Sequence, residues 1–208
     1  ENKMKRLLII LITLGLTCSV SAAGKIVVSA GQYLTVENET VAENIAVEGG
    51  SLTIINSTIL GNVKVEEQGS LDMSSNSNIN GTLKGDDYSS ISITDSTVEG
   101  LTQLTNAGSS PAIVNASSFL SPVHVMRSLF RATDSTFYNN LSIAGDKLYN
   151  NNLLRNAFKG DVKVNNTKVT TIVDSAELNN VTMNNNSAAN IIQNSLISGE
   201  VKMAFNSH

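Results

Sequence analysis

Residues 56–65 read N-S-T-I-L-G-N-V-K-V, and close copies of this ten-residue phrase begin at Asn76 (N-S-N-I-N-G-T-L-K-G), Asp134 (D-S-T-F-Y-N-N-L-S-I) and Asn194 (N-S-L-I-S-G-E-V-K-M). Looser copies begin at Asn38, Asp95, Ala116, Arg155 and Asp174. Successive copies start 18, 20, 19, 21, 18, 21, 19 and 20 residues apart. A period in that range is typical of stacked supersecondary units. The sequence therefore predicts a solenoid of about nine coils.

Apolar residues fall at the fourth, eighth and tenth places of the phrase. Alternation with a period of two, rich in β-branched side chains, favours a short strand over a helical face. The fourth place adds a second inward row, so each coil is expected to consist of strands and corners. The eighth-place column is Ile45, Val63, Leu83, Thr102, Val123, Leu141, Val162, Val181 and Val201, and the tenth-place column is Val47, Val65, Gly85, Leu104, Val125, Ile143, Val164, Met183 and Met203.

Two columns of the phrase are expected to form corners. The first place is Asn or Asp in seven of nine copies. The sixth place is Gly or Asn in seven, at Gly61, Gly81, Gly100, Asn139, Gly160, Asn179 and Gly199. Both residue types tolerate left-handed backbone and form side-chain to backbone turns. Stacked asparagines can also form amide ladders along the axis. We interpret both columns as structural rather than as binding sites.

The fourth-place column contains three consecutive aromatic residues, Phe119, Phe137 and Phe158. We expect them to stack inside the solenoid. Glu177 follows in the same column. Either a bulge turns Leu178 inward in its place, which we favour, or Glu177 is a buried carboxylate.

The N-terminal segment has the pattern of a secretory signal peptide. Met4-Lys5-Arg6 precede an apolar run over residues 7–16 that is too short to span a bilayer permanently. Small residues over 19–23 predict cleavage after Ala22 or Ala23, and residues 1–3 precede the expected natural start at Met4. We therefore expect a helical signal peptide over 1–23 and a β-helix domain over 24–208. The processed chain, without a membrane span, is expected to be secreted, at the cell surface or periplasmic.

Composition narrows the function. Cys18, the only cysteine, lies in the signal segment, so the processed chain can form neither disulfides nor thiolate metal sites. Lipidation of Cys18 is the less favoured alternative, since Gly15 and Thr17 depart from the usual motif. The processed chain has 11 basic and 17 acidic residues, a net charge of −6, which argues against nucleic-acid binding. We identify no catalytic, cofactor or metal motif.

The periodicity over residues 31–206 resembles the right-handed parallel β-helix of bacterial surface and secreted proteins, such as filamentous-haemagglutinin-like exoproteins and autotransporter passengers. Left-handed β-helices usually keep a strict hexapeptide pattern, and the drift in coil length here argues against that hand. The resemblance implies a structural or adhesive role.

The ninth place lies between two inward residues and is expected to face outward. It reads Ala46, Lys64, Lys84, Gln103, His124, Ser142, Lys163, Thr182 and Lys202. We call Lys64, Lys84, Lys163 and Lys202 the lysine row. Such a stripe can contact anionic glycans or cell-surface polysaccharide, although lysines on β surfaces more often serve solubility.

Two function classes remain open from the sequence: a structural or adhesive module, and a carbohydrate-binding or polysaccharide-active protein. The densest candidate for catalysis is Arg127, Arg131 and Asp134 with His124, but no carboxylate pair stands beside them. The irregular stretches 106–111 and 145–154 are too short to wall a groove, so the first class is favoured.

The end of the repeat bears on assembly. Little sequence follows Met203 to cover the last coil. Solenoids normally end in a capping element. We therefore expect either a cap or further coils, or end-to-end association with a second copy.

Overall fold

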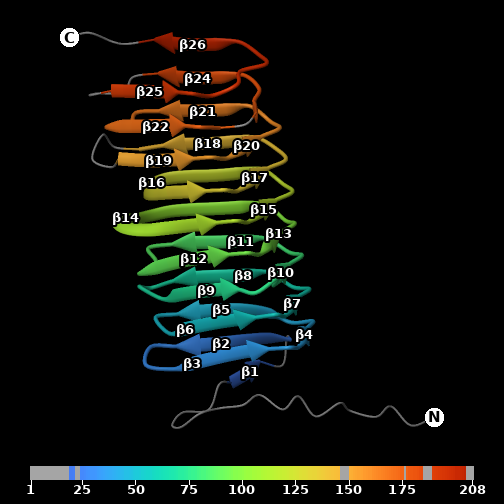
Figure 1. Ribbon diagram of the computed structural model, residues 1–208. Coiled ribbons are helices and arrows are strands. Elements are labelled where there is room, and N and C mark those ends of the chain that lie inside the picture. The colour runs from blue at the N-terminus through green and yellow to red at the C-terminus, as the bar shows by residue number, and fades with distance from the viewer. Residues whose placement is uncertain (1–18, 22–23, 146–149, 176, 185–188, 205–208) are drawn as a thin grey trace.

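The computed structural model describes residues 19–21, 24–145, 150–175, 177–184 and 189–204. These residues form parallel strands stacked into a β-solenoid, and none of them is helical (Figure 1). The predicted all-β parallel β-helix of about nine coils is confirmed. The helix expected for the signal segment lies mostly outside the described residues. Within that segment, Ser19–Ser21 form a strand, β1, where a helix was expected.

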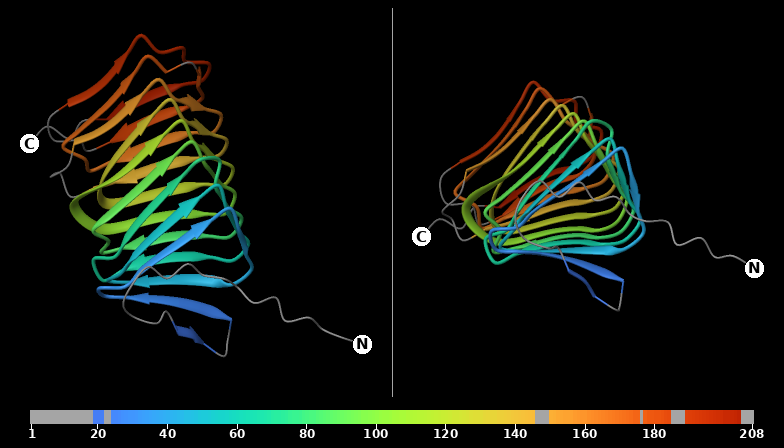
Figure 2. Two further views of the ribbon diagram at one scale, coloured as in Figure 1. Left: turned by 60° about the horizontal axis from the view of Figure 1, so that its bottom comes forward. Right: turned by 90° about the horizontal axis from the view of Figure 1, so that it is seen from below.

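Each coil contributes strands to three sheets, which give the solenoid a rounded triangular outline when it is seen from below (Figure 2). The first sheet contains β2 (Lys25–Ser29), β5 (Asn44–Glu48), β8 (Val63–Glu66), β11 (Leu83–Asp86), β18 (Leu141–Ala144), β21 (Val162–Asn165), β24 (Val181–Asn184) and β26 (Val201–Ala204). The second contains β3 (Tyr33–Glu37), β6 (Ser51–Ile55), β9 (Ser70–Ser74), β12 (Ser90–Thr94), β19 (Asn150–Leu154), β22 (Val169–Val173) and β25 (Ala189–Gln193).

Two long strands, β14 (Thr102–Asn115) and β16 (Val123–Thr133), continue around the corner and belong to both of these sheets. The stretch 106–111, which we expected to be irregular, lies within β14 and shifts the register between β14 and β16. The third sheet has two-residue strands: β4 (Thr40–Val41), β7 (Thr58–Ile59), β10 (Asn78–Ile79), β13 (Thr97–Val98), β15 (Ser118–Phe119), β17 (Thr136–Phe137), β20 (Ala157–Phe158) and β23 (Glu177–Leu178).

The core follows the predicted columns. Residues of the eighth and tenth places pair coil by coil, as Val162 does with Leu141 and Val181. All of the apolar side chains in both columns are buried except those of the last coil, Val201 and Met203. Gly85 leaves a gap in the tenth-place column that the side chains of Tyr88 and Ile91 fill: a Cβ at Gly85 would lie only 2.7 Å from Ile91 Cδ1 and 2.8 Å from Tyr88 Cδ1.

The aromatic column is also confirmed. Phe119 and Phe137 stack with ring centroids 5.2 Å apart, and Phe137 and Phe158 stack at the same distance. Leu178 continues the column, since it is fully buried and pairs with Phe158. Glu177 is therefore displaced outward, as expected, and its carboxylate forms an ion pair with Lys159 of the coil below.

The first-place corner is left-handed in every copy. The nine residues have φ between 44° and 58°, including Ala116 and Arg155, which have neither an Asn nor a Gly side chain to favour it. The predicted amide ladder forms where asparagines are stacked, since Asn56 Nδ2 donates to Asn38 Oδ1 at 2.7 Å. At other coils an ion pair replaces it: Arg155 binds both carboxylate oxygens of Asp134, each at 2.7 Å.

The sixth-place prediction needs a correction. Gly61, Gly81 and Gly100 do not have left-handed backbone. The chain instead passes so close to the preceding coil that a Cβ at each glycine would overlap its backbone, as between Gly81 and the Gly61 carbonyl. Close approach of two backbones, rather than conformation, selects glycine in this column.

The second place of the phrase forms an internal serine ladder. The Ser96 N–H donates to Ser117 Oγ at 3.2 Å, and the Ser117 N–H donates to Ser135 Oγ at 3.1 Å. All of these serine hydroxyls except that of Ser175 in turn donate to a carbonyl in their own coil, as Ser117 does to Asn115 at 2.7 Å. The column lies just inside the corner and is buried, so these hydroxyls satisfy backbone donors that water does not reach.

The two ends of the solenoid differ. At the N-terminal end, β1 pairs with β2 in the antiparallel direction, with Val20 opposite Ile26 (Figure 1). At the other end, Val201 and Met203 occupy inward positions but are 38% and 42% exposed. Among the described residues, no strand pairs with the outer edge of β26.

Candidate functional site

The outward face of the first sheet carries the ninth-place column. Its residues lie in register from coil to coil, so Lys64 sits directly beside Lys84. Gln103, His124 and Ser142 then separate Lys84 from Lys163. The lysine row is thus one line along the solenoid, with two adjacent members and two separated ones.

Acidic side chains flank the row at its N-terminal end. Lys64 forms an ion pair with Glu66, two residues along the same strand. The hydrogen bond to Glu66 raises the pKa of Lys64, and the charges of Glu48 and Asp86 add to this effect. Hydrogen bonds from Asn106 and Thr105 lower the pKa of Asp86, and Lys84 and Lys64 contribute through their charge. The adjacent lysines therefore lie in a mixed-charge field.

The C-terminal half of the row is more exposed. Lys202 pairs with Glu200 at 2.9 Å, and both side chains are largely open to solvent. Lys163 is exposed, with Asp161 two residues before it on the same face. An exposed ion pair contributes little energy and is screened by salt. Two of the four lysines thus have an acidic partner that an anionic ligand would need to displace.

Ala46 is the exception in the outward column, because it is only 1% exposed. The ion pair between Lys25 and Glu48, 3.1 Å long, joins β2 to β5, the strand that carries Ala46. A small side chain occupies this place, so the row begins at Lys64.

The candidate catalytic group is dispersed. His124 points outward from the first sheet, as expected, whereas Arg131 lies on the outward face of the second sheet. Arg127 stands at the corner between these sheets, where its Nη1 is 3.4 Å from Asn106 Oδ1. Asp134 is at the next corner and is bound by Arg155. The geometry does not bring these four side chains to one site.

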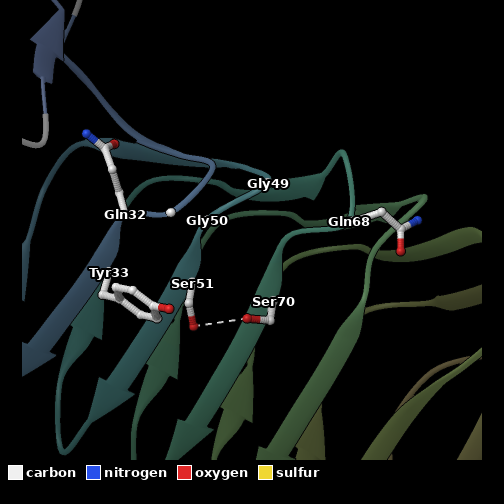
Figure 3. Close-up of a pocket in the computed structure, with 8 residues that line it drawn as sticks. Gln32, Tyr33, Gly49, Gly50, Ser51, Gln68 and Ser70 are labelled. Atoms are coloured by element: carbon white, nitrogen blue, oxygen red, sulfur yellow. Dashed lines mark hydrogen bonds between the residues drawn. The ribbon is translucent and has the colours of Figure 1, made fainter. Parts of the chain in front are cut away.

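The described surface has shallow hollows at its corners. One hollow, shown in Figure 3, lies in the first coils at the corner between the first and second sheets and has a volume of about 210 Å³. It is bordered by Gly31, Gln32, Tyr33, Gly49, Gly50, Ser51, Gln68 and Ser70, and we call it the Tyr33 hollow. Another, about 230 Å³, follows the first-place corner at Asn76, Asp95, Ser96, Thr97, Ala116 and Ser118.

Sequence reasoning missed the Tyr33 hollow. Tyr33 does not belong to the ten-residue phrase, so the phrase does not mark its column. Pairing of β3 with β6 and of β6 with β9 places Tyr33, Ser51 and Ser70 side by side. Tyr33 precedes the alternating Leu34 and Val36 on their strand, which was the available signal that it points outward.

Within the described ranges, no group of three or more His, Cys, Asp or Glu side chains has the spacing of a metal site. None of the described segments contains a helix long and apolar enough to cross a membrane.

Comparison with known proteins finds no matching family model, no matching curated protein and no matching solved structure. The resemblance to filamentous-haemagglutinin-like proteins and autotransporter passengers therefore stays a prediction based on periodicity.

Proposed function

We propose that this protein is a secreted or surface-exposed structural and adhesive module that holds flat polar faces along a rigid rod. The observation that carries the proposal is the in-register stacking of outward polar columns. On the second sheet Ser51, Ser70 and Ser90 lie side by side, and their neighbours Thr53, Asp72 and Ser92 form a parallel line.

A face of this kind suits adhesion to carbohydrate. Hydroxyl and carboxylate groups repeat at the spacing of the coils, about 4.8 Å. The strands that carry them are fixed by pairing on both sides and by a continuous apolar core. Such a surface loses little conformational entropy when it binds, which favours weak contacts repeated along an extended polymer.

Binding of the processed chain, residues 24–208, to an array of neutral and anionic glycans tests the proposal. We expect retention on carbohydrate with no release of shortened products. Failure to bind any glycan or any intact cell surface would contradict an adhesive role. Release of reducing ends or unsaturated products would instead support a polysaccharide-active enzyme.

Carbohydrate binding through the lysine row is the second candidate. Lys163 and Lys202 are the exposed members that favour it, and an anionic glycan is the ligand class that their charge suits. The flanking carboxylates of Glu66 and Glu200 act against it.

End-to-end association with a second copy is a further part of the proposal. The exposed inward side chains Val201 and Met203 give the last described coil an apolar end surface. At the other end, removal of β1 with the signal segment would free the edge of β2. The outward Lys25 of β2 continues the column that ends in Glu200, so stacking of two processed copies would bring opposite charges together.

A further inference from the structure

The Tyr33 hollow combines an exposed aromatic ring with polar groups around one space. Tyr33 is 74% exposed, more than the other exposed large apolar side chains of the described chain. Exposing an aromatic ring leaves a large apolar area in water. The ring projects from the start of β3 on the same face as Ser51 and Ser70, which are its neighbours on the next two coils (Figure 3).

The floor of the hollow is fixed by close packing. Gly49 has a φ of 75°, and a Cβ at Gly50 would lie 2.6 Å from the Ser29 carbonyl oxygen. Glycines are therefore required at this corner for the fold, and their lack of side chains leaves the space beside Tyr33 open. Gln32 Oε1 accepts a hydrogen bond from the Ser29 N–H at 2.7 Å, which holds the turn that positions Tyr33.

The polar groups that border the hollow are uncharged. Ser70 Oγ donates to Ser51 Oγ at 2.9 Å, which leaves the Ser51 hydroxyl proton available to donate to a ligand. At the far rim, Gln68 Nε2 donates to Asp87 Oδ1 at 2.6 Å and is held in place. Hydroxyl, amide and backbone groups surround one aromatic ring, and no charged side chain lines the space.

We infer that the Tyr33 hollow binds one neutral pyranose residue of a glycan. The apolar C–H face of the sugar covers the Tyr33 ring, and the sugar hydroxyls exchange hydrogen bonds with Ser51 and Ser70. No cationic side chain lines the hollow, and the carboxylate of Asp87 is bonded to its rim through Gln68, which disfavours uronic acids and sulfated sugars because nothing there compensates the desolvation of an anion. This inference rests on the proposed adhesive function and names its ligand class and site.

The site is small and open, so a single sugar binds weakly, with a dissociation constant on the order of millimolar. Affinity for a polymer then comes from repeated or neighbouring contacts along the rod.

The inference is tested by NMR titration of the isotope-labelled processed chain with methyl β-glucopyranoside, methyl α-mannopyranoside and methyl β-galactopyranoside. We expect at least one of them to shift the resonances of Tyr33, Ser51 and Ser70. Tyr33→Ala should weaken this binding about tenfold, the loss of one ring contact, while Tyr33→Phe should retain most of it.

Tyr138→Ala is the matched control. Tyr138 is also an exposed tyrosine, with 52% of its surface accessible, but it directly follows β17 of the third sheet. It should leave the titration unchanged. Circular dichroism verifies that each variant is folded, which is expected because both side chains project into solvent.

Equal sugar binding by the intact chain and by Tyr33→Ala, or no binding of any of the three glycosides, would overturn the inference. The proposed function would survive that result if the intact chain and Tyr33→Ala adhered equally to the glycan array. If the intact chain bound neither the glycan array nor an intact cell surface, the proposed function itself would be contradicted.

Discussion

Val162→Asp tests the strand phase on which the whole architecture rests. Val162 is 0% exposed and lies between Leu141 and Val181 of the neighbouring coils. Losing its buried apolar surface costs about 2 kcal/mol, and burying a carboxyl group without a partner costs at least about 2 more. We expect the free energy of unfolding to fall by more than about 4 kcal/mol at pH 7. Lys163→Asp, one residue away on the exposed face, should change it by less than about 1 kcal/mol.

Urea unfolding followed by circular dichroism near neutral pH and near pH 3.5 measures both differences. Burial raises the folded-state pKa of the introduced carboxyl group above its unfolded value of about 3.9. The destabilisation therefore grows as the pH rises above about 3.9 and is complete above the folded-state pKa. In acid the carboxyl group is protonated in both states, so the difference in unfolding free energy between the two variants should narrow. Equal destabilisation by the two substitutions, or a gap independent of pH, would refute the assignment of Val162 to the core.

Four other results are expected. Ser117→Ala leaves the buried N–H of Ser96 without its acceptor and should cost about 1–3 kcal/mol in thermal unfolding; an unchanged melting temperature would mean that water replaces the hydroxyl. Burial raises the pKa of Tyr88 to about 12, against the opposing effect of a hydrogen bond with Ser128, so thermal unfolding should show a loss of stability as the pH rises from about 10 towards 12, and Tyr88→Phe should remove that loss. If the lysine row binds anionic glycans, replacing all four lysines by Gln should abolish low-salt retention on a heparin-like column, and unchanged retention would leave the lysines a role in solubility. Light scattering of the processed chain should show mass rising with concentration, suppressed by Met203→Lys but not by Lys202→Gln, and a constant monomer mass would contradict end-to-end association.

The repeat predicted the fold well because each coil of a solenoid contacts only its neighbours, so residues at the same place of successive copies form one column. Aligning Ala116 and Arg155 with asparagines located left-handed corners that their own side chains do not suggest. The displacement of Glu177 by Leu178 followed from the same alignment, since an apolar column tolerates no unpaired carboxylate.

Alignment of the repeats does not predict the distances and side-chain packing between neighbouring coils. Glycine in the sixth place was attributed to backbone conformation, whereas the distance to the previous coil is what excludes a Cβ. The filling of the Gly85 gap by Tyr88 likewise depends on where a corner residue folds back. The Tyr33 hollow escaped notice because it is assembled from the less regular half of each coil, where the spacing varies and no phrase marks the columns.

The internal serine ladder has a consequence for how this molecule can change in length. Most corner N–H groups find an acceptor on the following coil, as Ser96 does on Ser117 and Ser117 does on Ser135. Removing part of a coil breaks this chain of donors and acceptors, whereas removing a whole coil joins one hydroxyl to the next equivalent N–H. Insertions and deletions in this protein and its descendants should therefore be tolerated in units of one complete turn, and the distance between its two ends is set in steps of one strand spacing.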